Sequence, residues 1–338
     1  MDPVRLLLIS STAVLSLMLL IEWNQYSDEY QKQQSDLYSA AIAEPLMLGD
    51  ETAGTPLSGG LDEGIPSVNQ EASPLAVFLD DSETFTLSTD TLNLVISADG
   101  GDVVSASLPK FPVRLDAPDQ PFRLLENNSL RRYVAQSGLI GPDGIDASGN
   151  RAPYASQGLT NNGDGSHTLT LAWTGNDPLG LQVYKRFSAY DDRYDVDVSF
   201  DIRNGGRSVA SITSFAQLKR DNTQAPDGNT GFGVSPYLGA ALTQPDERYT
   251  KLSFSDLGDG PFSKRLPAGW VAILQHYFVS AWIPSQQTSH DYFASQLSNG
   301  DNVIGYKNQN VDIAPGSATT ITQTLYVGPK DQVVLADL

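Results

Sequence analysis

Residues 91–101 have the sequence TLNLVISADGG, and this stretch is the strongest indication of the fold. Apolar and polar residues alternate up to Ile96, and Asp99-Gly100-Gly101 follows. Such alternation predicts a strand with one buried face, and Asp-Gly is a strong signal for a hairpin turn. A second apolar run covers residues 103–108, and we expect Pro109 to end it. The sequence therefore predicts an antiparallel hairpin.

The same pattern continues along the chain, with turn signals every 8–15 residues. The further expected strands are 167–173, 181–187, 194–202, 209–218, 269–282, 291–297, 302–307 and 318–327. No long segment has the 3.6-residue period of an amphipathic helix, and only residues 329–338 are expected to begin one. A parallel α/β sheet would need helices between its strands. We therefore predict an all-β fold, an antiparallel sandwich of many strands.

The N-terminal segment has a different composition. Leu6 to Ile21 are sixteen residues without a charge, and residues 4–23 have the length of about twenty that spans a bilayer. Arg5 precedes the segment and acids follow it, which places the N-terminus in the cytoplasm. A cleaved signal peptide is the alternative, but the first A-x-A motif, Ala41 to Ala43, comes about twenty residues too late. We expect residues 1–23 to be a transmembrane signal-anchor.

The net charge of −19 is concentrated in one stretch. Residues 22–90 contain fourteen acids and one base, whereas residues 91–338 contain 25 acids and 19 bases. Proline and glycine interrupt residues 44–74, so we predict an acidic flexible linker over residues 24–80, with an acidic docking arm as the alternative. The sandwich domain is then expected over residues 81–338. The acidic balance argues against nucleic-acid binding, which needs a basic surface.

Motifs for chemistry are scarce. The chain has no cysteine, which excludes disulfides and thiolate nucleophiles. His167, His276 and His290 show no metal-binding spacing. We therefore predict no catalytic residue, no cofactor and no metal.

Two residue groups leave alternatives open. Four acids could bind calcium or simply end a hairpin: Asp191, Asp192, Asp195 and Asp197. Six late aromatic residues could form a sugar-binding platform or the core of the sandwich: Trp270, Tyr277, Phe278, Trp282, Tyr292 and Phe293.

Several short segments, taken together and in order, resemble the Gram-negative form of the YidC family of bacterial membrane protein insertases. These segments are residues 92–103, 120–126, 135–139, 214–219, 237–241, 245–249, 269–284, 304–307 and 325–329. The resemblance implies a periplasmic β-supersandwich, similar to galactose mutarotase, anchored in the inner membrane by a single span. It also implies partners: the Sec translocon components SecD and SecF, and nascent membrane proteins.

The resemblance has one departure. In the family, insertion is carried by five transmembrane helices that follow this domain, and no second apolar stretch of eighteen residues occurs here. No insertase residue can therefore be assigned. We expect a binding module rather than an enzyme, with Tyr249 and Phe254 contributing to a partner surface.

A carbohydrate-binding or mutarotase-like sandwich is the alternative function. It would need a general acid and base facing one cleft. These would come from the three histidines and from acids such as Glu126 or Asp291.

Overall fold

The computed structural model describes seven ranges of the chain. These are residues 82–113, 118–146, 150–175, 179–223, 237–244, 250–275 and 277–330. The predicted signal-anchor (1–23) and linker (24–80) lie outside them. Within the described ranges, no helix is long and apolar enough to cross a membrane.

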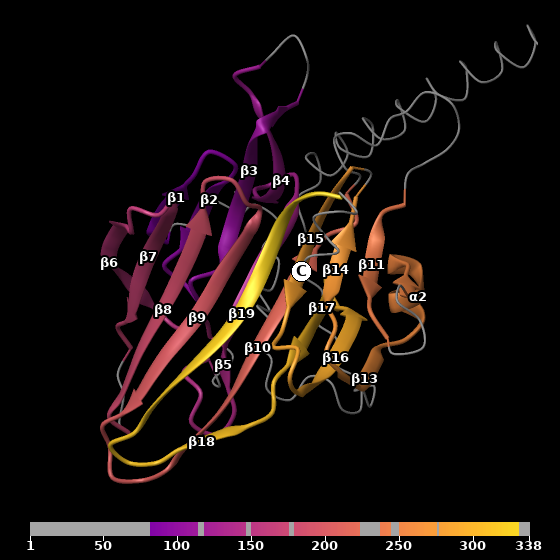
Figure 1. The fold of residues 1–338 in the computed structure, drawn as a ribbon. Coiled ribbons are helices and arrows are strands. Elements are labelled where there is room, and N and C mark those ends of the chain that lie inside the picture. Colours follow the sequence, from indigo (N-terminus) through magenta and orange to yellow (C-terminus); the bar gives the residue numbers. More distant parts are fainter. Residues whose placement is uncertain are drawn as a thin grey trace, which may run out of the picture. The chain divides into compact units, whose positions relative to one another are not determined.

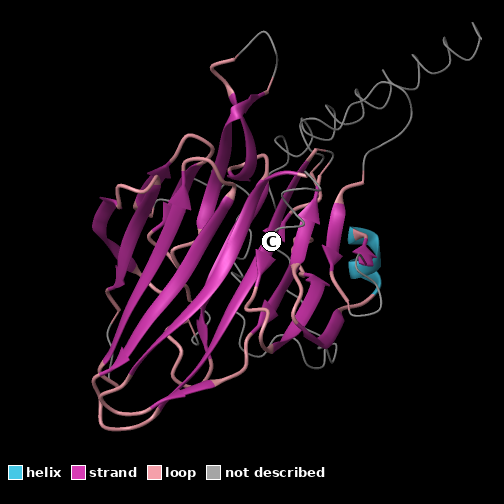
Figure 2. Cartoon of the chain, in the orientation of Figure 1, coloured by secondary structure: helices cyan, strands magenta, loops and turns pink. Residues whose placement is uncertain are grey.

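The described strands form two antiparallel sheets that face each other (Figures 1 and 2). The first sheet has ten strands. Their order is β1 (Thr84–Ser88), β2 (Asn93–Ser97), β3 (Val103–Pro112), β4 (Pro121–Asn127), β5 (Arg132–Ile140), β10 (Ala210–Arg220), β17 (Asn302–Lys307), β16 (Ser289–Gln296) and β13 (Phe262–Pro267), with β18 (Val311–Ile313) paired to β10.

The second sheet has nine strands. Their order is β12 (Thr250–Leu252), β11 (Gly239–Leu242), β14 (Val271–Leu274), β15 (Phe278–Ile283), β19 (Ala318–Pro329), β9 (Asp195–Asn204), β8 (Leu181–Tyr190), β7 (Ser166–Trp173) and β6 (Tyr154–Asn161). One short helix, α2 (Phe254–Asp259), lies beside the β11 and β13 end of the structure (Figure 1).

Alternation along the strands builds the core. In β8 every second residue, from Leu181 to Ala189, is buried, and the residues between them are at least partly exposed. The main apolar cluster takes buried side chains from both sheets, for example Leu94 and Ile96 from β2 and Phe187 from β8. Period-2 patterning therefore places one face of each sheet in a shared core, as expected for a sandwich.

The predicted hairpin between residues 181 and 202 is confirmed. β8 and β9 pair from Leu181 opposite Asn204 to Ala189 opposite Val196, so both strands run further than the sequence suggested. The predicted pairing around the Asp99-Gly100-Gly101 turn is also confirmed, since β2 pairs with β3.

Two sequence expectations were wrong. Pro109 does not end β3, because the strand continues to Pro112; the register with β4 shifts between Leu108 and Pro112, and an irregular ladder tolerates proline. Residues 269–282 are two strands rather than one, since the backbone turns at Gln275, whose N–H donates to the Phe278 carbonyl at 2.9 Å. Pro329 is the last residue of β19, and residues 331–338, over which the sequence predicts the start of a helix, lie outside the described residues.

The helix α2 was missed, although a local signal marks it. Ser253 accepts a hydrogen bond from the Asp256 N–H at 3.1 Å, and the Asp256 carboxylate accepts from the Ser253 N–H at 2.9 Å. This reciprocal capping box stabilises the first turn. The spacing S-x-x-D is visible in the sequence.

Candidate functional site

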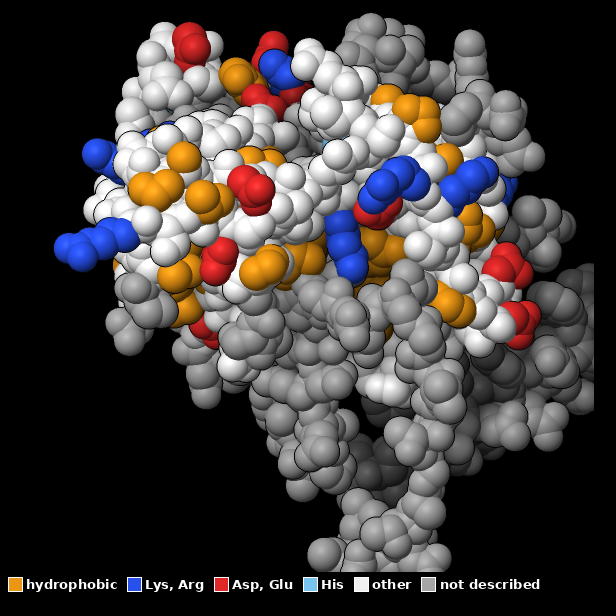
Figure 3. Space-filling model, turned by 90° about the horizontal axis from the view of Figure 1, so that it is seen from below, with side chains coloured by type: hydrophobic (Ala, Val, Ile, Leu, Met, Phe, Trp, Pro, Cys, Tyr) orange, Lys and Arg blue, Asp and Glu red, His pale blue; other side chains and the backbone are white. Residues whose placement is uncertain are grey.

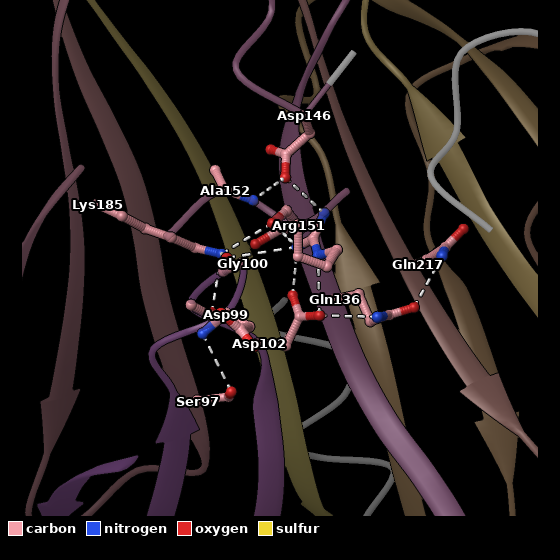
Figure 4. A network of polar contacts seen from close by, with 12 residues as sticks. Ser97, Asp99, Gly100, Asp102, Gln136, Asp146, Arg151, Ala152, Lys185 and Gln217 are labelled. Atoms are coloured by element: carbon pink, nitrogen blue, oxygen red, sulfur yellow. Dashed lines mark hydrogen bonds and ion pairs between the residues drawn. The ribbon is translucent and has the colours of Figure 1, made fainter. Parts of the chain in front are cut away.

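Two groups of buried polar side chains bridge the sheets. The first, here called the ionic cluster, consists of Asp102, Asp146, Arg151 and Lys185 (Figure 4). Asp102 stands just before β3, and Lys185 lies in the middle of β8 in the opposite sheet. Asp146 and Arg151 belong to the connection from β5 to β6.

The ionic cluster completes an open edge of β5. β3 pairs with β5 at a single position, Val103 opposite Ala135. Further along β5, side chains take the place of a strand: the Asp146 carboxylate accepts from the Leu139 N–H at 2.9 Å, and Arg151 donates to the Ser137 carbonyl at 2.8 Å. Buried backbone groups that lack a strand partner therefore find side-chain partners.

Arg151 is held between two carboxylates. It pairs with Asp102 through Nε, at 3.1 Å, and through Nη2, and with Asp146 through Nη1 at 3.1 Å. Burial lowers the pKa of Arg151, but the two carboxylates outweigh burial and the pKa is raised. The guanidinium therefore stays charged.

Lys185 joins the second sheet to this cluster. Its Nζ donates to the carbonyls of Gly100, Gly101 and Ser137, each at 2.9 Å. Burial lowers the pKa of this lysine to about 7, with partial compensation from Asp102.

Gly100 and Gly101 have φ values of +76° and +58°, in the region that favours glycine. A Cβ at Gly100 would collide with the Arg151 side chain. The Asp-Gly-Gly turn therefore closes the hairpin and also lets the Arg151 and Lys185 side chains come close to its backbone.

The second group, here called the arginine cluster, consists of Arg131, Arg220, Gln275 and Tyr133. Arg131 Nη2 and Arg220 Nη1 both donate to Gln275 Oε1, at 3.0 and 2.5 Å. Both guanidiniums also lie over the Tyr133 ring, at 5.8 and 4.9 Å from its centroid. The Tyr133 hydroxyl bonds the Ser280 hydroxyl of β15, and burial raises the tyrosine's pKa. Two cations thus meet on one neutral oxygen.

The two clusters differ in how completely their donors are used. Arg131 Nε, Arg131 Nη1 and Gln275 Nε2 are buried and have no hydrogen-bond partner among the residues that the structure describes. The carboxylate nearest to Arg131 in the described ion pairs is Glu126, whose Oε2 lies 3.9 Å from Nη1, beyond hydrogen-bond distance. No charged atom of the ionic cluster is among the buried polar atoms that lack a partner in the described structure.

Comparison with known proteins identifies the family. A family profile described as "YidC periplasmic domain" matches residues 84–338. The chain belongs to the YidC family.

Curated relatives agree over the full chain. The membrane protein insertase YidC of Pseudomonas entomophila (strain L48) is 37% identical over 348 residues, covering 100% of this chain and 60% of the relative. That of Pseudomonas putida (strain W619) is 36% identical over 342 residues, with the same coverage. The chain therefore spans 60% of the length of these YidC proteins.

The solved structures that match this chain are more distant in sequence. A galactose mutarotase related enzyme from Lactobacillus acidophilus is 12% identical with a TM-score of 0.49, covering 72% of this chain and 97% of the other. A galactose mutarotase-like protein from Lactobacillus casei ATCC 334 is 9% identical with a TM-score of 0.45, covering 72% and 100%.

Of the two partner-binding residues predicted for this YidC-family chain, Tyr249 lies outside the described residues. Phe254 is the first residue of α2, is half-buried and packs against the main apolar cluster. Its role in partner binding stays a prediction.

The described acids and bases considered for sugar chemistry are dispersed. His167 pairs with Asp191 at 3.1 Å, at the end of the β7–β8 hairpin in the second sheet. His290 lies in β16 of the first sheet, where Nδ1 bonds Asn308 at 2.6 Å. Asp291 pairs with exposed Arg265. His276 lies outside the described residues.

The structure also bears on the two alternatives that the sequence left open, calcium binding by the four acids and sugar binding by the six late aromatic residues. Asp191, Asp195 and Asp197 bond His167, Arg193 and Thr324 respectively, and within the described ranges no group of three or more His, Cys, Asp or Glu residues could hold a metal ion. Most of the late aromatic residues belong to the core: Phe278, Trp282, Tyr292 and Phe293 are all buried. Tyr277, in contrast, is 62% exposed.

Neither cluster was predicted, although one signal for the ionic cluster was available. Lys185 occupies an inward position of an alternating strand, between Val183 and Phe187. A lysine among buried apolar positions indicates a buried partner. Arg131 and Gln275, which are 144 residues apart, carry no comparable local signal.

Proposed function

We propose that this chain is the periplasmic portion of a YidC-type insertase, anchored in the inner membrane by residues 1–23 and tethered by residues 24–80. It assists the insertion and folding of membrane proteins by binding partners, namely SecD, SecF and nascent membrane proteins, and it is not itself an enzyme. The observation that carries this proposal is the match of residues 84–338 to the YidC periplasmic domain. The alignment of the whole chain with proteins named as insertases supports it.

The two broad sheets favour the finer description of the domain as a β-supersandwich. On the face seen from below, apolar side chains lie in small groups among polar and charged ones (Figure 3). A surface of this mixed kind supports reversible contacts better than a permanent apolar interface. The separate pairing of the described candidate acids and bases also supports a binding role.

We further propose that Tyr249 and Phe254 contribute to the partner surface. Ser255 and Asp256, which follow Phe254 on the short helix, are exposed, so a partner could reach this end of the chain's α2. Since Phe254 also packs on the core, Tyr249 is the cleaner position to test.

The test is a pull-down of the periplasmic regions of SecD and SecF by the full chain in detergent. We expect retention, and a several-fold weaker retention by Tyr249→Ala. The matched control is Tyr184→Ala, a tyrosine that is 38% exposed on β8. Retention no greater than that by a peptide of residues 24–80 would contradict the proposal.

A further inference from the structure

The arginine cluster is built by two tight turns, one from each sheet. In the β4–β5 turn, the Asn128 side chain accepts from the N–H groups of Leu130 and Arg131, both at 2.9 Å. In the β14–β15 turn, the N–H of Gln275 donates to Phe278 at 2.9 Å. Each turn fixes the backbone of a residue whose side chain enters the cluster. The cluster is therefore preorganised before any ligand arrives.

The side-chain donors of Arg131 and Gln275 outnumber the acceptors that they find among the described residues. Gln275 Oε1 already accepts from both arginines, and the Leu124 carbonyl accepts from Arg131 Nη2 at 3.3 Å. Within the described part of the chain, Arg131 Nε, Arg131 Nη1 and Gln275 Nε2 have no acceptor. Each buried donor left without an acceptor costs about 1–3 kcal/mol, and more when it is charged. An anionic acceptor satisfies a charged donor more effectively than a neutral one does, and because Arg131 Nε and Nη1 lie on different edges of the guanidinium, one carboxylate binds one of these two donors.

The surroundings indicate which acceptor fits. Glu126 approaches Arg131 Nη1 to 3.9 Å while remaining partly exposed, so a carboxylate already stands at the solvent side of the cluster. Leu130 and Tyr277, which neighbour Arg131 and Gln275 in the chain, are 66% and 62% exposed. Large exposed apolar side chains one or two residues away in the chain from these buried donors favour a ligand with an apolar body and one anionic end.

We propose that the arginine cluster is a binding site for a carboxylate carried on an apolar chain. Arg131 and Gln275 bind the carboxylate, Leu130 and Tyr277 contact the apolar chain, and Glu126 competes with the ligand for Arg131. The assignment goes beyond the proposed function and does not depend on it, because it concerns a small-ligand site and not a translocon surface.

The test is isothermal titration of the full chain in detergent with four probes at constant ionic strength. The probes are sodium acetate, sodium octanoate, and an N-acetylated alanine–leucine tetrapeptide with either a free C-terminal carboxylate or a C-terminal amide. We expect saturable binding of the acids, with octanoate or the free-acid peptide binding more tightly than acetate. We expect the free-acid peptide to bind at least about tenfold more tightly than its amide. The stronger of octanoate and the peptide acid identifies the carrier.

Variants make the test specific. Arg131→Met should abolish the difference between the peptide acid and the amide. Glu126→Gln should raise the affinity for the acids about three- to tenfold by removing the competing carboxylate. Arg265→Met, an exposed arginine on β13, is the control and should change nothing.

Glu126→Gln keeps the inference testable if Arg131→Met fails to fold, as circular dichroism would reveal. Equal binding of peptide acid and amide would overturn the proposal. So would a Glu126→Gln variant that binds no more tightly than the unmodified chain, or an absence of saturation by any acid.

Discussion

The ionic cluster and the arginine cluster both bridge the two sheets, yet they differ in charge balance. In the ionic cluster two carboxylates face a guanidinium and an ammonium. Backbone carbonyls accept the hydrogen bonds of the donors that the carboxylates do not reach. In the arginine cluster two guanidiniums share a neutral amide oxygen, and several donors remain unused. A buried polar network that is fully satisfied rigidifies the core and specifies one structure, whereas a buried donor left without an acceptor lowers stability.

The largest expected effect follows from breaking the ionic cluster at its centre. Arg151→Met would leave Asp102 and Asp146 buried without their cation, and we expect a loss of about 3–5 kcal/mol in the free energy of unfolding. Urea unfolding at pH 7 measures it. Arg265→Met, which removes an exposed ion pair, should change the midpoint little. A similar small change for Arg151→Met would show that the ionic cluster does not hold the sheets together.

The second prediction concerns the pH dependence caused by Lys185. Folding lowers the pKa of this lysine to about 7, from 10.5 in the unfolded chain. Between these values the unfolded chain binds more protons, so the free energy of unfolding should rise with pH, by roughly 2 kcal/mol from pH 7 to pH 9.

Lys185→Met is the matched control, because it removes the titrating group while keeping an unbranched side chain. Urea unfolding of both proteins at pH 7, 8 and 9 measures the difference in slope. Parallel pH profiles would mean that Lys185 keeps its ordinary pKa in the folded chain.

Tyr154 tests the edge of the ionic cluster at alkaline pH. Its buried hydroxyl has no hydrogen-bond partner in the described ranges, and burial, followed by the charge of Asp146, raises its pKa well above 10.0. A raised folded pKa contributes stability that is complete below pH 10 and is lost as pH rises further. Tyr154→Phe should therefore be close to neutral at pH 7. At pH 11 it should be more stable than the unmodified chain by about 1.4 kcal/mol.

Thermal unfolding at pH 7 and pH 11 measures this effect, with Tyr184→Phe as the exposed control. If both variants were stabilised equally at pH 11, the loss of stability at alkaline pH would come from tyrosines in general and not from the burial of Tyr154.

The smallest effect is expected in the arginine cluster. Arg131→Met removes two bonded contacts but also two unsatisfied donors, and it leaves no carboxylate deeply buried. We expect a change of about 1 kcal/mol or less in the free energy of unfolding. Urea unfolding of this variant beside Arg151→Met compares the two clusters directly. A loss as large as that of Arg151→Met would show that the arginine cluster is structural in the same way.

Much of the fold could be predicted from local sequence. The Asp99-Gly100-Gly101 turn and the alternation of residues 181–202 gave correct hairpins, since side-chain period and turn residues act over a few positions. The expectation that Pro109 ends its strand was wrong, because the effect of a proline depends on whether the neighbouring hydrogen-bond ladder is regular at that point. The β14–β15 turn was missed because no Gly, Pro, Asn or Asp marks residues 275–277.

The amino-acid sequence was sufficient to establish an antiparallel β-rich chain, the absence of cysteine chemistry and a resemblance to the YidC family. The pairing of Lys185 with Gly100, 85 residues away, and of Arg131 with Gln275 required the folded sheets. Alternation specifies which face of a strand is buried, but not which strand lies opposite it. Strand order is set by contacts across the whole domain, so the two clusters, and the difference between them, exist only after the sheets have packed.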